Sequence, residues 1–200
     1  MDNPNSILFL FEGETEREFY DILFDNYQID RKIKINKIDL KGIWSINEKV
    51  KNRTYEYLAK SKSPKITVII AHDREGIKSK KSCVNLNLLK KEFVKGKNSR
   101  IKEIKETIAT QDLESWLFHD IDNIYKHLKT PSKERNTKNY LNVESKNNTD
   151  LSTLFHKYGK HYQKGSKVEG FLLKLDFVKI YNKTPELQEL IKYIKSLIEE

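Results

Sequence analysis

Short apolar runs alternate with amphipathic stretches along the first half of the chain. The clearest run, KITVIIA at 65–71, is nearly all apolar and rich in β-branched residues, as strands covered on both faces are. The run SILFLF at 6–11 is also long enough for a buried strand. With two weaker, partly alternating patterns, the predicted strands are 6–11, 33–40, 65–71 and 102–109. Apolar residues at helical spacing between them predict helices over 14–27, 44–59 and 85–94.

The predicted order of strand, helix, strand, helix, strand, helix, strand is typical of an α/β fold. Its sheet is expected to be mostly parallel, because each helix carries the chain back so that the next strand runs in the same direction. Such sheets place their binding sites at the carboxyl ends of the strands. We therefore expect a mostly parallel sheet of about four strands, flanked by helices, with a site at that edge.

Beyond the fourth strand the pattern is helical and interrupted. Segment 130–150 is rich in Asn, Lys, Ser and Thr, and we predict a loop or mobile segment there. A closing amphipathic helix is predicted over 186–198. Shorter helical patterns cover 111–119, 121–128, 151–161 and 165–175. We therefore expect a domain over 1–128 and, over 129–200, a basic and mainly helical C-terminal extension that packs on it.

Positive charge is concentrated in the second half of the chain. The formal net charge is +9, and the segment from Lys126 to Lys183 holds 13 basic against 5 acidic residues, which accounts for eight of the nine surplus charges. A basic region beside an acidic site suits a polyanionic substrate such as nucleic acid. A general lysine bias of the source proteome would give the same composition, so charge alone leaves both interpretations open.

Composition narrows the class of protein. Apolar residues make up 37% of the chain, and 9 Phe, 10 Tyr and 2 Trp suffice for a core, so wholesale disorder is not expected. No apolar run approaches the ~20 residues that a membrane-spanning helix needs. The polar start and the single cysteine, Cys83, favour a cytoplasmic protein without a signal peptide, an internal disulfide or a Cys-based zinc site.

Acidic residues follow two of the predicted strands. Glu12 comes directly after the first strand, and Glu16 falls in the first turn of the next helix. Asp73 and Glu75 follow the third strand and share one face if the backbone is extended. Carboxylates at two neighbouring strand ends are suitable ligands for a hard cation such as Mg²⁺. Each carboxylate alone is more often a solvated charge, and acidic residues in a first helical turn also complement the helix dipole.

Three segments carry a resemblance to a known family: LFLFEGETEREFY at 8–20, VIIAHDREG at 68–76 and IATQDLESWLFHD at 108–120. Together they resemble the TOPRIM domains of the OLD-type nuclease superfamily. The similarity is closer to small stand-alone TOPRIM-like proteins, including RloB-like ones, that occur with ATPases in bacterial defence and mobile loci. The resemblance implies a TOPRIM/Rossmann-like sheet and a metal-dependent nuclease or nicking activity.

The resemblance assigns roles to the acidic residues. Glu12 matches the invariant glutamate of the family's first motif, and Glu16 matches the second glutamate of OLD-like members. Asp73 matches the first aspartate of the D-x-D motif, whereas Glu75 stands where the family has the second aspartate. Glutamate keeps the charge but adds a methylene, which puts a second metal more in doubt than the first. Glu114 is implied as a further metal ligand or as a residue that supports one.

OLD-like nucleases also use a lysine near the scissile phosphate. The fragment Tyr162-Gln163-Lys164-Gly165 resembles a tail element of these proteins, so Lys164, or alternatively Lys167, is the candidate for neutralising charge in the transition state. For the aromatic residues of the 111–119 helix we expect core packing, and for Asp112 a helix N-cap. The predicted nucleic-acid track consists of Lys157, Lys160, Lys164 and Lys167.

Three functions remain open from the sequence. The leading one is a nuclease that uses Mg²⁺ or Mn²⁺ to cleave or nick DNA or RNA. The second is a non-catalytic or weakly catalytic TOPRIM-like subunit that serves as an interaction module for an ABC/AAA-type ATPase partner. The third is a nucleic-acid binder without chemistry. Because the sequence has no Walker-type loop, any ATPase function is expected to belong to a partner.

Overall fold

The fold is built on a four-stranded, all-parallel sheet with the strand order β2-β1-β3-β4. The computed structural model describes residues 5–74, 83–95 and 100–199. The strands are β1 (Asn5–Phe11), β2 (Lys34–Asp39), β3 (Lys65–Asp73) and β4 (Ile101–Ala109). The helices between them are α1 (Glu14–Asn26), α2 (Ile46–Lys60) and α3 (Leu86–Lys95). The predicted α/β class, the parallel sheet and its flanking helices are confirmed.

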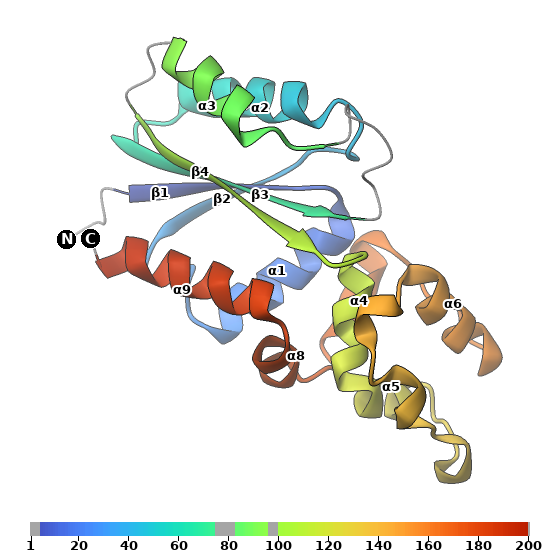
Figure 1. The fold of residues 1–200 in the computed structure, drawn as a ribbon. Helices are drawn as coiled ribbons and strands as arrows, with labels where there is room; N and C mark the ends of the chain where they lie inside the picture. Colours follow the sequence, from blue (N-terminus) through green and yellow to red (C-terminus); the bar gives the residue numbers. More distant parts are fainter. Residues whose placement is uncertain (1–4, 75–82, 96–99, 200) are drawn as a thin grey trace.

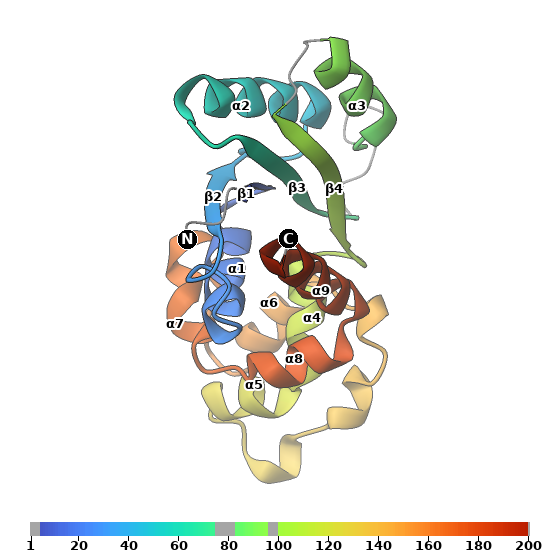
Figure 2. The same cartoon turned by 90° about the vertical axis from the view of Figure 1, so that its left-hand side faces the viewer.

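Helices cover both faces of the sheet (Figures 1 and 2). α2 and α3 lie on one face, and α1 and the last helix, α9 (Pro185–Glu199), lie on the other. Side chains of β1 alternate between the two layers, because Leu8 and Leu10 belong to the cluster under α2 and α3 while Phe9 belongs to the opposite one. This double cover explains why the whole of β1 is buried and reads as one apolar run.

The second half of the chain forms a helical layer beneath the sheet (Figure 1). Its helices are α4 (Leu113–Leu117), α5 (Ile121–His127), α6 (Asn148–Lys157), α7 (Glu169–Leu172) and α8 (Phe177–Lys183). Short 3-10 turns at 118–120, 132–134, 137–140, 143–145 and 165–168 connect them. One hydrophobic cluster contains Phe9 and Phe19 together with Leu151 and Ile191, so both sides of the expected boundary at 128 share a core. Nowhere in the described part of the chain is a helix both long and apolar enough to span a membrane.

The start of α6 and the whole of α8 differ from the sequence expectation. The loop predicted over 130–150 is wrong at its end, because α6 begins at Asn148. There the Asn147 side chain accepts from the backbone N–H of Asp150, and the Asp150 side chain accepts from that of Asn147, which completes a capping box. The pattern gives no helix for α8, whose start is fixed by a bond from the Lys179 N–H to Asp176 Oδ1 of 3.0 Å.

Candidate functional site

The carboxyl ends of β1 and β3 lie side by side, because Phe11 pairs in register with Ala71. Glu12 therefore leaves its strand next to the last residues of β3, and its carboxylate accepts a hydrogen bond from the backbone N–H of Asp73. Gly13 follows in extended backbone, and a Cβ there would lie 3.3 Å from Glu16 Oε2. Glycine at this turn thus gives the Glu16 carboxylate room to lie against the strand end.

Asp73 connects the sheet to the helical layer. It is the last residue of β3 and is only 8% exposed. Its Oδ1 accepts a hydrogen bond of 3.0 Å from the backbone N–H of Leu113, the first residue of α4. The start of α4 is therefore held against the same sheet edge that carries Glu12, and α4 delivers its own carboxylate, Glu114, to that edge.

Glu114 is fully buried and binds two side chains from a distant segment. Its Oε1 accepts a hydrogen bond of 3.0 Å from the Tyr162 hydroxyl and lies 3.1 Å from Lys164 Nζ. The Lys164 side chain is 48% exposed while that of Glu114 is not exposed at all, so this cation is open to solvent and its partner is not. The arrangement presents one positive charge at the rim of an acidic cluster.

Segment 159–165 is the strap that brings Tyr162 and Lys164 to the site. It runs between two glycines with positive φ, Gly159 at 68° and Gly165 at 77°. The Gly165 N–H donates to Thr15 Oγ1 at 2.9 Å, which fastens the end of the strap to the first turn of α1. Left-handed backbone at both ends is accessible to glycine at little cost, so the sequence supports this path.

Burial and mutual repulsion raise the pKa values of the acidic residues. Desolvation, followed by the charges of Glu16, Glu12, Glu114 and Asp112, raises the pKa of Asp73 from 3.8 to about 9. Desolvation raises the pKa of Glu16 to about 7, with Glu114 and Glu12 adding to the effect. The pKa of Glu12 is also raised, mainly by burial. Such a cluster is costly to ionise without a compensating cation.

Lys164 provides part of that compensation. Partial burial by itself lowers its pKa, but the Glu114 charge, the hydrogen bond to Glu114 and the charge of Asp112 outweigh this, so the net shift is upward. The lysine therefore stays protonated across the ordinary range of pH. It lowers the pKa values of Glu12, Glu16 and Asp112 through its charge.

The donor set suits a hard divalent cation. Two buried carboxylate oxygens, Glu12 Oε2 and Glu114 Oε2, have no hydrogen-bond partner among the described atoms, and such oxygens are the ligands that Mg²⁺ and Mn²⁺ prefer. Within residues 5–74, 83–95 and 100–199, no three His, Cys, Asp or Glu side chains are already drawn together around one metal position. The expected ligand Glu75 lies outside the described residues.

The structure separates the four lysines of the predicted nucleic-acid track. Lys164 belongs to the acidic site, and the Lys160 ammonium donates to the backbone carbonyl of His127. Lys157, at the end of α6, is exposed and lies over the Tyr158 ring at 5.3 Å, and Lys167 is exposed in the turn before α7. Lys157 and Lys167 are therefore exposed surface lysines, whereas Lys160 and Lys164 also bind groups within the protein.

Two members of the site were not among the expected site residues. Asp112 caps α4 as expected, with the Ser115 N–H donating to its Oδ1 at 3.1 Å, but its Oδ2 also accepts from the Asn148 N–H at 2.6 Å. Its pKa is raised to about 7 by burial and by Glu114, which makes it part of the cluster. In the sequence Tyr162 is only a near neighbour of Lys164, and no local pattern shows that its hydroxyl reaches Glu114.

Comparison with known proteins gives one match. Residues 11–195 match the family described as "Domain of unknown function (DUF4276)". Neither the curated proteins nor the solved structures contain a match to the chain. The matched range includes β2 to β4 and every residue of the acidic site, so the family description covers the whole arrangement without assigning it an activity.

Proposed function

The chain belongs to the DUF4276 family, to which no function is attached, and from its site we propose that it is a divalent-metal-dependent nuclease acting on DNA or RNA. One observation carries this proposal. Asp73, at the carboxyl edge of a parallel sheet, lies within electrostatic reach of Glu12, Glu16, Asp112 and Glu114, and Lys164 is bound to Glu114. A buried, mutually repelling set of carboxylates with one cation at its rim is suited to a metal and a phosphate together.

The residues of the site have different roles in the proposed reaction. Glu12 in the turn after β1, Glu16 in the first turn of α1 and Asp73 at the end of β3 offer carboxylate oxygens. Glu12 and Glu114 each hold an oxygen that is free to take a ligand. Lys164, held by Glu114, directs its positive charge toward a phosphate at the rim. When bound, Mg²⁺ or Mn²⁺ would supply an activated water and stabilise the leaving oxygen.

The resemblance to OLD-type TOPRIM proteins extends the proposal to the biological setting. It supports a cytoplasmic role in bacterial defence or in a mobile element, beside an ABC/AAA-type ATPase. The departure at Glu75 favours a single well-held metal over two. In the alternative proposal, the chain is a non-catalytic or weakly catalytic subunit whose main task is to bind the ATPase, and a cleavage assay separates the two.

The test is a cleavage assay on supercoiled plasmid and on single-stranded RNA, with Mg²⁺, Mn²⁺ or chelator. We expect metal-dependent nicking or cleavage by the wild type and at least a hundredfold loss in Asp73→Asn, whose amide oxygen can still accept from the Leu113 N–H. Asp39→Asn is the matched control, because Asp39 ends β2 at the same edge and its carboxylate serves only the Lys41 N–H among the hydrogen bonds of the described residues.

Two results would count against a nuclease. Cleavage that persists in Asp73→Asn would show that the activity belongs to a contaminant or to another site. No cleavage with either metal, alone or with a candidate ATPase added, would leave the interaction module as the better proposal.

A further inference from the structure

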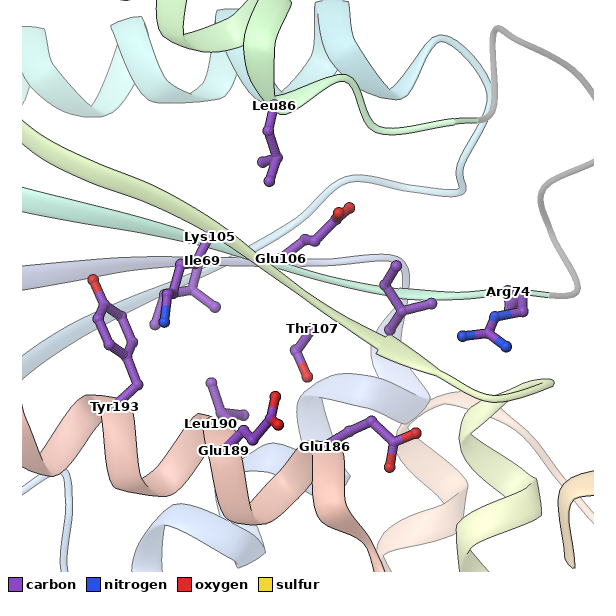
Figure 3. A pocket seen from close by; sticks show the side chains of 11 residues that line it. Ile69, Arg74, Leu86, Lys105, Glu106, Thr107, Glu186, Glu189, Leu190 and Tyr193 are labelled. Atoms are coloured by element: carbon purple, nitrogen blue, oxygen red, sulfur yellow. The ribbon is translucent and has the colours of Figure 1, made fainter.

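β4 is an edge strand of the sheet among the residues that the structure describes. β4 pairs with β3 on one side, and the described part of the chain places no strand on the other. A hollow of about 400 Å³ follows this edge. Leu86 at the start of α3 bounds it on one side, and Glu189 and Tyr193 of α9 bound it on the other (Figure 3). The edge is thus flanked by helices but not covered by them.

The backbone of β4 presents hydrogen-bonding groups to this hollow. The Ala109 carbonyl accepts from the Arg74 N–H at 3.1 Å, so it faces β3. Carbonyl directions alternate along a strand, and Ile104, Glu106 and Ile108 therefore direct their peptide groups outward. A row of such groups is a template for one more strand.

The order of charged residues along β4 indicates which kind of strand can pair with its outer edge. Around Ile104 the chain reads Lys102-Glu103-Ile104-Lys105-Glu106, so charges of opposite sign stand at equal distances on the two sides. If a second β4 runs antiparallel with its Ile104 opposite this one, Glu103 faces Lys105 at two places. Lys102 lies at the irregularity where the register of β4 on β3 shifts between Ile101 and Glu103, so it is left out of this pairing. Each Glu103 then lies opposite a Lys105 of the other copy, and these pairs of opposite charge stabilise an antiparallel pair.

We propose that β4 is a homodimer interface, at which two copies of this chain join edge to edge into one continuous sheet. The two-fold axis is perpendicular to the sheet and passes between the two copies of Ile104. Because the N–H and C=O groups of Ile104 point outward, the two copies of this residue can exchange both of their backbone hydrogen bonds. Each face is preserved across the axis, so α3 meets the α3 side of the partner and α9 meets its α9 side. This inference does not depend on the nuclease proposal.

The pattern favours a second copy over an unrelated peptide. β4 alternates Lys and Glu about a central Ile, and a second copy in the reverse direction places Glu103 opposite Lys105 at two places without any further requirement on the partner's sequence. Because the strands of the two copies run in opposite directions, their two acidic sites lie toward opposite ends of the joined sheet.

Sedimentation velocity of the full chain over a range of concentrations tests the interface. We expect a dimer for the wild type and at least about tenfold weaker association for Lys105→Glu, which puts like charges opposite Glu103 at two places. Combining Glu103→Lys with Lys105→Glu restores opposite charges across the axis and should restore the dimer. Both residues contact Tyr193 within one chain, at 2.7 Å and 3.8 Å, and damage to those contacts would not be rescued by the exchange.

Hydrogen exchange supplies the second measurement. The amides of Ile104 and Glu106 should be protected in the dimer and should exchange faster in folded Lys105→Glu, with thermal melting as the check on folding. A wild type that stays monomeric at all concentrations would overturn the proposal. So would a dimer that is insensitive to both charge variants, or protection of these amides in a monomer by a bound foreign peptide.

Discussion

At the scale of single residues, Asp73 is the most constrained group of the site. It accepts the bond that anchors α4, it is nearly inaccessible to water, and four other carboxylates raise its pKa along with burial. Ionising a buried carboxylate of this kind costs free energy. The stability of the folded protein should therefore depend on pH and on bound metal.

The first prediction concerns the stability of the metal-free protein. Because the pKa of Asp73 rises from 3.8 to about 9 on folding, the folded chain keeps a proton that the unfolded chain releases over this interval. The melting temperature in chelator should therefore fall as pH increases through that interval, and Asp73→Asn should flatten the decline. Scanning calorimetry across pH measures this, and equal slopes in the two proteins would contradict it.

Added metal should reverse the trend. A cation competes with the protons held by Asp73 and Glu16, so Mg²⁺ or Mn²⁺ should raise the melting temperature more at pH 9 than at pH 7, values near the pKa values of these two groups. Asp73→Asn should abolish most of the rise, and Asp39→Asn should keep it. A metal-induced shift that is the same at both pH values would argue against these ligands.

Lys164 permits a test of charge at the rim. Lys164→Met removes the cation beside Glu114, and we expect the single-turnover cleavage rate at saturating substrate to fall about a hundredfold or more. Lys164→Arg should retain part of the rate. Lys133→Met removes an equal charge from the exposed 132–134 turn and serves as the control. Equal losses in both Met variants would mean that only overall charge matters.

At the scale of elements, the strap over 159–165 decides whether Lys164 reaches the site. It is held at its end by the bond from Gly165 to Thr15, and in its middle by the hydroxyl of Tyr162. Tyr162 also packs edge-on against Phe155 of α6, at 5.4 Å between ring centroids. The strap thus joins α1, α4 and α6 at one place, which ties the position of a charge to helix packing.

The two glycines of the strap form a matched pair for mutation. Gly165→Ala and Gly159→Ala both place a side chain at positive φ and should each cost about 1 kcal/mol of stability. Only at Gly165 would the new Cβ also meet Glu14 Oε2, at 3.0 Å, next to Lys164. We therefore expect Gly165→Ala alone to lower the cleavage rate, as measured beside thermal melting. A rate loss of the same size in Gly159→Ala would contradict this.

At the scale of the whole molecule, negative and positive charge are arranged around one sheet edge. The acidic site lies at the carboxyl ends of β1 and β3, and most of the surplus positive charge comes from the segment 126–183 that forms the layer beneath it. Nucleic acid that spans both would be held by lysines and cut at the carboxylates. On the proposed function, cleavage depends on the carboxylates and binding on the lysines, with Lys164 belonging to both groups.

A salt series on two variants tests the separation. Asp73→Asn should bind nucleic acid as well as the wild type or better, since it removes a negative charge and leaves the lysines in place. Replacing Lys157, Lys160, Lys164 and Lys167 together should weaken binding and reduce the steepness of its salt dependence by roughly 0.7 to 0.9 per lost phosphate contact. Gel-shift titrations measure both. Unchanged binding by the four-lysine variant would mean that this surface serves a protein partner instead.

The sequence by itself determines the sheet and the positions of its acidic ends. Apolar runs and helical spacing are local properties, and they predict β1 to β4 and the helices between them to within one or two residues at most boundaries. They also place Glu12 and Asp73 at the ends of neighbouring strands, because parallel connections leave few alternatives. They do not predict α8 or the early start of α6, which depend on side-chain caps at Asp176 and Asn147.

Only the tertiary structure decides which groups complete the site. Tyr162 and Lys164 reach Glu114 from nearly 50 residues away, through a strap whose path depends on packing against α1 and α6 and not on local periodicity. Burial likewise comes from the assembled layers, and burial is the main cause of the raised pKa of Asp73. A carboxylate at a strand end is visible in the sequence, but its surroundings exist only once distant segments have closed around it.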